Sequence, residues 1–235
     1  MKPGILYLIP TPLGDPGEEL VQFPGNKEII ESLEIFIVEE LRTARRFLKK
    51  SGISRSIDAL TFFELNEHTV QQESEHFLDP ALAGKNIGLL SEAGLPCIAD
   101  PGHTVVMLAH RKGIRVIPLV GPSSLMLALM ASGMNGQQFV FHGYLPAKPN
   151  ERVQALRSLE KDIHIHHRTQ IFIEAPYRNQ AMLDSIRNSC NGETRLCIAI
   201  DLTMETEYIS TRPIAGWKNN LPDLHKRPAV FLLGE

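Results

Sequence analysis

Acidic side chains follow two short apolar stretches of the sequence. Glu39 and Glu40 come directly after Ile35–Val38, and Arg42 stands two residues further on. A second polar group follows the next apolar stretch and consists of Glu64, Asn66 and Glu67. A carboxylate could take the proton from a reacting hydroxyl group, and Arg42 or Asn66 could orient the reacting partner. Acidic residues at the start of a helix also stabilise its dipole, so that reading stays open beside the catalytic one.

Two loops rich in glycine and proline are candidates for holding a ligand, although the first could equally be a structural turn. The first, residues 10–17, has neither the G-x-G-x-x-G pattern nor the lysine of a phosphate-binding loop, which disfavours dinucleotides and nucleoside triphosphates. The second, residues 92–102, would let backbone amides and carbonyls reach a ligand with few side chains in the way. Such a loop suits a neutral adenosyl group better than a phosphate. Asp100 could bind that ligand or cap the helix that follows.

Histidines and cysteines do not form a convincing metal site. His164, His166 and His167 are close in sequence, but no cysteine or carboxylate scaffold accompanies them. The three cysteines, Cys97, Cys190 and Cys197, are widely spread and include no C-x-x-C pair. We therefore expect no bound metal, no disulfide framework and three ordinary thiols.

Composition and charge are those of an ordinary globular chain. Hydrophobic residues make up 43% and charged residues 22% of the 235 residues, and the net charge is -3. Such a charge gives no overall footprint for nucleic acid, although lysine and arginine gather locally. These basic groups, which could contact phosphates or simply face solvent, are Arg42, Arg45, Arg46, Lys49 and Lys50, and Lys148, Arg152, Arg157, Lys161 and Arg168.

The apolar runs are short and alternate with longer amphipathic segments. None approaches the roughly 20 residues that cross a bilayer, and the N-terminus lacks the pattern of a signal peptide, so we expect no membrane association and a cytoplasmic location. In the first half the pattern predicts strands over 5–9, 35–38, 60–63, 86–90 and 115–119. Helices are expected between them, over 27–33, 40–50, 69–82 and 103–112. This alternation is typical of parallel sheets with helical crossovers.

A G-P-S-S stretch at residues 121–124 interrupts this rhythm, and Ser123 or Ser124 could cap a helix that runs to about Ser132. Further strands are predicted over 139–144, 170–174, 195–200, 207–211 and 229–233, with helices over 151–160 and 178–188. Residues 161–168 are polar and predict a surface turn or a short edge strand. The fold class is therefore α/β with two domains, 1–118 and 119–235. The first should hold a mostly parallel sheet with helices on both faces, and the second a mixed sheet.

The loops belong to an ordered series of motifs. The series reads T-P-L-G-D-P at 11–16, E-E-L-R at 39–42, F-E-L-N-E at 63–67, S-E-A-G-L-P-C-I-A-D-P-G at 91–102, G-P-S-S at 121–124, F-H-G-Y-L-P-A-K at 141–148, E-A-P-Y-R at 174–178 and I-D-L-T-M at 200–204. In this order, the motifs resemble the tetrapyrrole methylase superfamily, the class III S-adenosylmethionine-dependent methyltransferases. The closest branch is that of bacterial methyltransferases acting on a cytidine ribose 2′-hydroxyl in small-subunit ribosomal RNA.

The resemblance implies a cofactor, a site and partners. Its members bind S-adenosylmethionine in the cleft between two α/β domains and commonly form homodimers. Carried over by position, the cofactor contacts would be Pro12, Leu13, Gly94, Leu95, Ile98, Ala99, Asp100, Ser123, Ser124, Ala175 and Pro176. The catalytic candidates are Glu39, Glu40, Arg42 and Glu67. The branch further implies RNA or a ribosomal subunit as the partner.

The sequence also departs from that branch. Leu41, Leu95, Ile200 and Met204 stand where the branch has polar or charged residues. The residues expected to bind the cofactor thus match that branch better than the residues expected to meet the methyl acceptor. Two alternatives stay open for this reason: a methyltransferase acting on a small molecule such as a tetrapyrrole, and a cofactor-binding relative without turnover.

Overall fold

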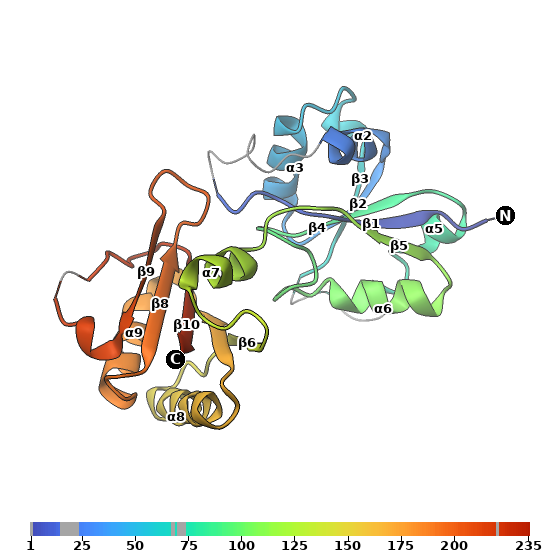
Figure 1. Ribbon diagram of the computed structural model, residues 1–235. Helices are drawn as coiled ribbons and strands as arrows, with labels where there is room; N and C mark the ends of the chain where they lie inside the picture. The colour runs from blue at the N-terminus through green and yellow to red at the C-terminus, as the bar shows by residue number, and fades with distance from the viewer. Residues whose placement is uncertain (1, 15–23, 67–68, 70–73, 220) are drawn as a thin grey trace. The chain divides into compact units, whose positions relative to one another are not determined.

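The chain consists of two compact units, each with its own five-stranded sheet (Figure 1). The computed structural model describes residues 2–14, 24–66, 69, 74–219 and 221–235. The units are Met1–Ser123 and Ser124–Glu235. The division expected from the sequence, between residues 118 and 119, falls shortly before this one.

The first unit is built on a parallel sheet. Its strands are β1 (Ile5–Ile9), β2 (Ile35–Val38), β3 (Thr61–Glu64), β4 (Ile87–Leu90) and β5 (Arg115–Pro118). They lie in the order β3-β2-β4-β1-β5, and every neighbouring pair is parallel. The helices are α2 (Pro24–Ser32), α3 (Leu41–Lys50), α5 (Asp79–Leu82) and α6 (His103–Arg111). This arrangement confirms the parallel sheet expected for the first half.

Helices cover both faces of that sheet, α2 and α3 on one and α5 and α6 on the other (Figure 1). The apolar residues accordingly form two layers. Phe36 packs with Ile30 of α2 and Leu48 of α3, whereas Ile37, the next residue of β2, packs with Val105 of α6. Because each side chain of β2 and β4 meets one of these layers, all residues of both strands are buried.

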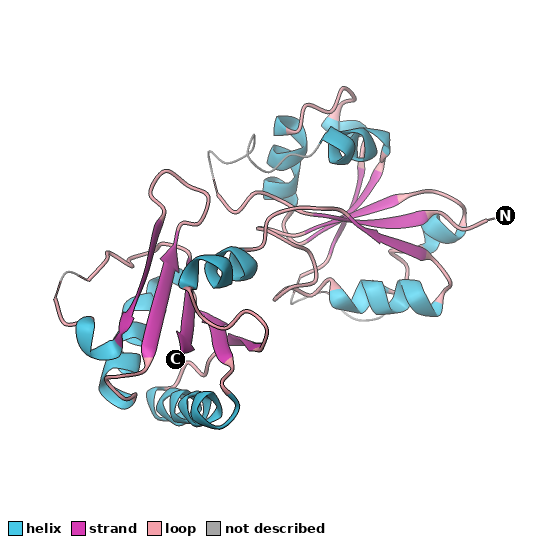
Figure 2. Cartoon of the chain, in the orientation of Figure 1, coloured by secondary structure: helices cyan, strands magenta, loops and turns pink. Residues whose placement is uncertain are grey.

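The second unit contains a mixed sheet, as expected (Figure 2). Its strands are β6 (Phe139–Tyr144), β7 (Thr169–Ile173), β8 (Arg195–Ile200), β9 (Tyr208–Pro213) and β10 (Ala229–Gly234). In the order β6-β7-β10-β8-β9 only β6 and β7 are parallel neighbours. Its helices are α7 (Ser124–Ser132), α8 (Pro149–His166) and α9 (Asn179–Ser189). Apolar residues of α8 and α9 pack with Phe172, Phe231 and Trp217 in one core.

The prediction of a surface turn or edge strand over residues 161–168 is wrong. Helix α8 continues to His166 and ends where His167 takes a left-handed conformation with φ of 54°. Leu156, Leu159 and Ile163 are all buried and share one face of the helix. Since Ile163 extends that stripe onto the core, tertiary packing keeps the polar segment helical.

Among the described residues, the helix predicted over residues 69–82 is interrupted by turns. Ser74 is helical, residues 75–78 form turns, and Asp79–Leu82 forms helix α5. Pro80 stands in the first turn of α5, where its missing N–H costs no helical hydrogen bond. Residues 70–73 lie outside the described part of the chain. None of the helices in the described ranges has the length and apolarity to cross a membrane.

Candidate functional site

The carboxyl ends of β1 and β4 form a topological switch point in the first sheet. The strands are neighbours, but the chain leaves β1 towards α2 on one face and leaves β4 towards α6 on the other (Figure 1). Open parallel sheets bind ligands at such points, because the diverging connections leave a crevice. The two glycine- and proline-rich loops singled out in the sequence begin here.

A pair of backbone hydrogen bonds joins the two loops. Thr11 N–H donates to the Gly94 carbonyl at 2.9 Å, and Gly94 N–H donates to the Thr11 carbonyl at 3.1 Å. The Ser91 hydroxyl donates to the same Gly94 carbonyl at 2.9 Å. Gly94 has φ of +77°, and a Cβ there would lie 3.0 Å from Leu13 Cδ2 and 3.4 Å from the Pro122 carbonyl oxygen. Glycine therefore suits this left-handed backbone conformation, and an added Cβ would crowd the end of the Leu13 side chain.

Asp100 holds the second loop together from inside. Its carboxylate accepts hydrogen bonds from Cys97 N–H at 2.9 Å and from Gly102 N–H at 2.7 Å. Cys97 and Ala99 are both left-handed, with φ of 68° and 63°.

 The loop is thus bent tightly around the Asp100 side chain, which acts as a cap and not as an exposed acceptor. Burial, and then the charge of Asp100, raise the pKa of the Cys97 thiol to about 11.

A pocket of about 190 Å³ opens beside the joined loops. The residues that line it are Thr11, Pro12, Leu13, Gly14, Ser91, Glu92 and Ala93 from the loops and Thr43, Ala44, Arg46, Phe47 and Lys50 from α3. The Thr43 hydroxyl donates to the Glu92 carboxylate at 2.7 Å, which ties α3 to the second loop. Leu95 is half-buried, whereas Ile98 and Ala99 are exposed on the far part of that loop.

The structure separates the two neighbouring carboxylates of the first acidic group. Glu40 is the N-cap of α3, and its carboxylate accepts from Arg42 N–H at 2.9 Å and Thr43 N–H at 2.8 Å. These hydrogen bonds, that from Arg42 first, lower the pKa of Glu40, which makes it a weaker base. Glu39 is half-buried and shares a small hollow with Asp100. Arg42 is exposed, and Glu67 lies outside the described residues.

The cofactor contacts predicted in the second unit are Ala175 and Pro176, and they lie between the two partners of an ion pair, Glu174 and Arg178. The Glu174 side chain is fully buried, and its Oε1 accepts from Ala175 N–H at 2.7 Å and from Arg178 Nε at 2.9 Å and Nη2 at 2.6 Å. The hydrogen bond with Glu174 raises the pKa of Arg178 above its ordinary value. Glu174 Oε2 has no hydrogen-bond partner among the described residues.

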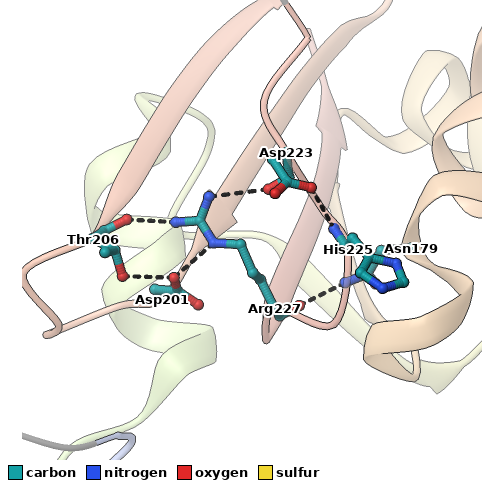
Figure 3. Close-up of polar contacts among 6 residues, drawn as sticks. All are labelled: Asn179, Asp201, Thr206, Asp223, His225 and Arg227. Atoms are coloured by element: carbon teal, nitrogen blue, oxygen red, sulfur yellow. Dashed lines mark hydrogen bonds and ion pairs between the residues drawn. The ribbon is translucent and has the colours of Figure 1, made fainter.

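A second buried carboxylate lies at the same edge of that sheet (Figure 3). Asp201 accepts from Arg227 Nε and from the Thr206 hydroxyl, both at 2.7 Å. Arg227 also donates to the Thr206 carbonyl at 2.6 Å and to the Asp223 carbonyl at 3.0 Å. Sequence reasoning missed this network, although an aspartate directly after the apolar strand β8 was a signal for it. The Asn179 side chain donates to the Arg227 carbonyl at 2.7 Å and links the network to α9.

Ser123 ends the first unit and Ser124 begins the second, at the start of α7, and both are half-buried. Arg152 is buried and donates to Ser185 Oγ and the Ala147 carbonyl, so it has a packing role within the unit. Within the described ranges, no three histidine, cysteine or acidic side chains gather in a group that could hold a metal ion.

Comparison with known proteins relates this architecture to a family. Protein-family models give no match. The chain is 34% identical over 211 residues to "Ribosomal RNA small subunit methyltransferase I" of Vibrio cholerae, covering 90% of this chain and 69% of the relative. The protein of that name in Escherichia coli O157:H7 is 34% identical over 214 residues, with 90% and 70% coverage. The chain belongs to this methyltransferase family.

Solved structures of other methyltransferases share the fold of this family member. The methyltransferase CobJ superimposes with a TM-score of 0.66 at 16% identity, over 99% of this chain and 94% of its own. A uroporphyrin-III-C-methyltransferase from Thermus thermophilus gives a TM-score of 0.56 at 16% identity, with 100% and 93% coverage. At this identity the likeness shows the fold alone. The resemblance to the tetrapyrrole methylase superfamily is confirmed.

The four residues that differ from the ribosomal RNA branch lie in different parts of the structure and differ in burial. Leu41 is the first residue of α3, and Leu95 is half-buried within the second loop. Ile200 is the buried last residue of β8, and Met204 is half-buried just beyond it. Ile200 thus contributes to the core of this member of the family.

Proposed function

We propose that this methyltransferase takes its methyl group from S-adenosylmethionine and transfers it to RNA, at a ribose 2′-hydroxyl of ribosomal RNA. The observation that carries the proposal is the pair of hydrogen bonds between Thr11 and Gly94, which joins two predicted cofactor loops at the switch point of the first sheet. The names of the sequence relatives support ribosomal RNA as the acceptor.

The chemistry of the loops fits the proposed cofactor. The pocket beside the joined loops is lined by apolar residues such as Pro12, Leu13 and Phe47, and Gly94 approaches Leu13 closely. A ligand site of this composition suits a large neutral group with a few hydrogen-bonding atoms. S-adenosylmethionine, when bound, supplies a methyl group on a positively charged sulfur, so the protein needs no covalent nucleophile.

The residues of the chain then have three tasks. Asp100 and Gly94 fix the shape of the second loop, so that the cofactor is held in one orientation. Glu39 is the proposed base that accepts the proton of the acceptor hydroxyl, because Glu40 already caps α3. Arg46 and Lys50 line the pocket from α3 and would contact phosphates of the acceptor. We further propose a homodimer in the cytoplasm that binds RNA or a ribosomal subunit.

A transfer assay tests the proposal. Small ribosomal subunits, free ribosomal RNA and a tetrapyrrole precursor are incubated in parallel with the protein and cofactor carrying a tritiated methyl group. We expect label in the subunit RNA, recovered after alkaline hydrolysis as an alkali-resistant dinucleotide, because a methylated 2′-oxygen can no longer attack the adjacent phosphate. Label only in the tetrapyrrole would favour the small-molecule alternative. No label in either RNA sample would contradict the proposal.

A further inference from the structure

Two exposed tyrosines and an arginine lie at one edge of the second sheet. Strands β6 and β7 are parallel, so their carboxyl ends meet at the same edge. Tyr144 is the last residue of β6, and Tyr177 follows β7 by four residues. Their exposed fractions are 57% and 70%, which is high for aromatic residues of a folded unit. The guanidinium carbon of Arg178 lies 5.4 Å from the centre of the Tyr177 ring.

The segment that carries Tyr177 is held firmly on both sides. Pro176 and Arg178 flank it in a short 3-10 helix, and Arg178 is fixed by two hydrogen bonds to the fully buried Glu174. Directly after it, Asn179 is buried and bonded to the Arg227 carbonyl. An aromatic ring on such a segment is presented to solvent with little conformational freedom to lose on binding.

The position of Tyr144 depends on an irregularity in β6. The register with β7 shifts between Phe141 and Tyr144, and Gly143 in this bulge has φ of +65°. Bulges of this kind re-aim the side chains that follow them. Tyr144 contributes, together with Glu174 and Tyr177, to the raised pKa of Arg178, which places it near that guanidinium. Arg178 donates to Glu174 through Nε and Nη2, and its Nη1 donates to none of the described residues.

We propose that Tyr144, Tyr177 and Arg178 form a stacking platform for an unpaired RNA nucleotide. Flat aromatic faces beside a guanidinium group are the surface on which proteins stack unpaired bases, and the remaining N–H groups of Arg178 can bind a base edge or a phosphate. The inference rests on the proposed function, because it describes how the same enzyme would hold an RNA acceptor. Tyr177 directly follows Ala175 and Pro176, so a base stacked there would lie beside the predicted cofactor contacts.

Binding of RNA by the 235-residue chain tests the platform without relying on turnover. Fluorescence anisotropy is measured with a labelled 12-nucleotide single-stranded RNA and with a duplex of the same length. We expect Tyr177→Leu to weaken binding of the single strand at least fivefold, and Tyr144→Leu to a similar or smaller extent, since each removes a stacking face. Tyr177→Phe keeps the ring and should change binding less than twofold. Duplex binding should not respond to Tyr177→Leu.

Phe139→Leu is the matched control, because Phe139 is the exposed aromatic residue at the opposite end of β6. It should leave binding of the single strand unchanged. Equal binding by the wild type and a Tyr144→Leu, Tyr177→Leu double variant would overturn the platform while leaving the RNA function standing. An equal loss of affinity for S-adenosylhomocysteine in Tyr177→Leu would assign the ring to the cofactor and also overturn it. No binding of the wild type to any RNA would contradict the proposed function itself.

Discussion

The two units present their candidate sites by opposite means. At the switch point of the first sheet, the loops are shaped by backbone hydrogen bonds and by Gly94. Ion pairs of that unit, such as Arg45 with Asp58 and Arg55 with Glu34, have exposed carboxylates. At the edge of the second sheet, two buried carboxylates, Glu174 and Asp201, are each paired with an arginine. A loop shaped by its own backbone can fit a neutral group such as the adenosyl part of the proposed cofactor. Buried ion pairs instead fix the positions of side chains and make them sensitive to the loss of one partner.

The largest expected effect tests the buried charge of the second unit. Arg227→Met would leave Asp201, whose side chain is only 7% exposed, without its counter-charge. We expect the free energy of unfolding to fall by about 3 kcal/mol, near the low end for buried pairs because Arg227 itself is partly exposed. Trp217, the only tryptophan and fully buried in this unit, reports the transition by fluorescence during urea unfolding.

Arg187→Met is the control for this prediction. Arg187 pairs at 3.6 Å with Asp184, which is half exposed, in the same unit. An exposed pair contributes less than about 1 kcal/mol, so this variant should unfold close to the wild type. If both variants lost the same unfolding free energy, burial of the Asp201 carboxylate would not make its ion pair more important for stability than an exposed pair.

The next effect concerns charge in the first unit. Glu39→Gln should lower the rate of methyl transfer at saturating substrate about 100-fold, because the proposed base is lost. Glu40→Gln should keep that rate and only weaken the cap of α3. Since the pKa of Glu40 is lowered in the folded state, its contribution to stability is present above its ordinary pKa and is lost as the pH falls through the lowered value. Single-turnover assays and acid unfolding measure the two effects. A large rate loss in Glu40→Gln would reverse the assignment.

A smaller effect tests whether the first site depends on backbone shape. Gly94→Ala forces a side chain into a left-handed position, at about 1 kcal/mol, and crowds Leu13. We expect the affinity for S-adenosylhomocysteine, measured by calorimetry, to fall about tenfold, which corresponds to roughly 1.4 kcal/mol. Gly113→Ala supplies the control, because Gly113 has φ of +67° but no atom within 4 Å of the added Cβ. It should be destabilised similarly, as followed by circular dichroism, and bind the ligand normally.

The smallest effect compares thiols in the two units. Burial raises the pKa of both Cys97 and Cys190 to about 11, so only about one thiol in a thousand is ionised at pH 8. Both should react slowly with a disulfide reagent in the folded protein. Bound S-adenosylhomocysteine should slow Cys97 further and leave Cys190 unchanged, as peptide mapping would show. Because the folded-state pKa values are raised, stability should also fall as the pH rises above about 9. Protection of Cys190 would place the ligand elsewhere.

Most strands could be predicted because their signal is local. An apolar run such as Ile35–Val38, flanked by polar residues, has few other uses than a strand buried on both faces. The end of α8 could not be predicted in the same way. His164 and His166 face solvent, and the helix persists because Ile163 reaches the core, which depends on the neighbouring elements.

The candidate site shows the same division. The positions of the glycine and proline loops followed from the sequence, but the role of Asp100 as a cap and the separation of Glu39 from Glu40 did not. The hydrogen-bonding capacity of a carboxylate can be satisfied by several nearby N–H groups, and only the backbone path decides which. Asp201 and Arg227 are 26 residues apart in sequence, so their pairing could be recognised only once the strand order of the sheet was known.

By itself the sequence determined the α/β class, the position of the loops and the resemblance to a methyltransferase family. These follow from the spacing of apolar residues and the order of the motifs, which are both local properties of the sequence. Tertiary structure decided which loops meet at the switch point and which charges are buried. It also decided that Tyr144 and Tyr177 share one edge. These features depend on the pairing of strands distant in sequence, and that pairing is fixed only when the helices and sheets pack together.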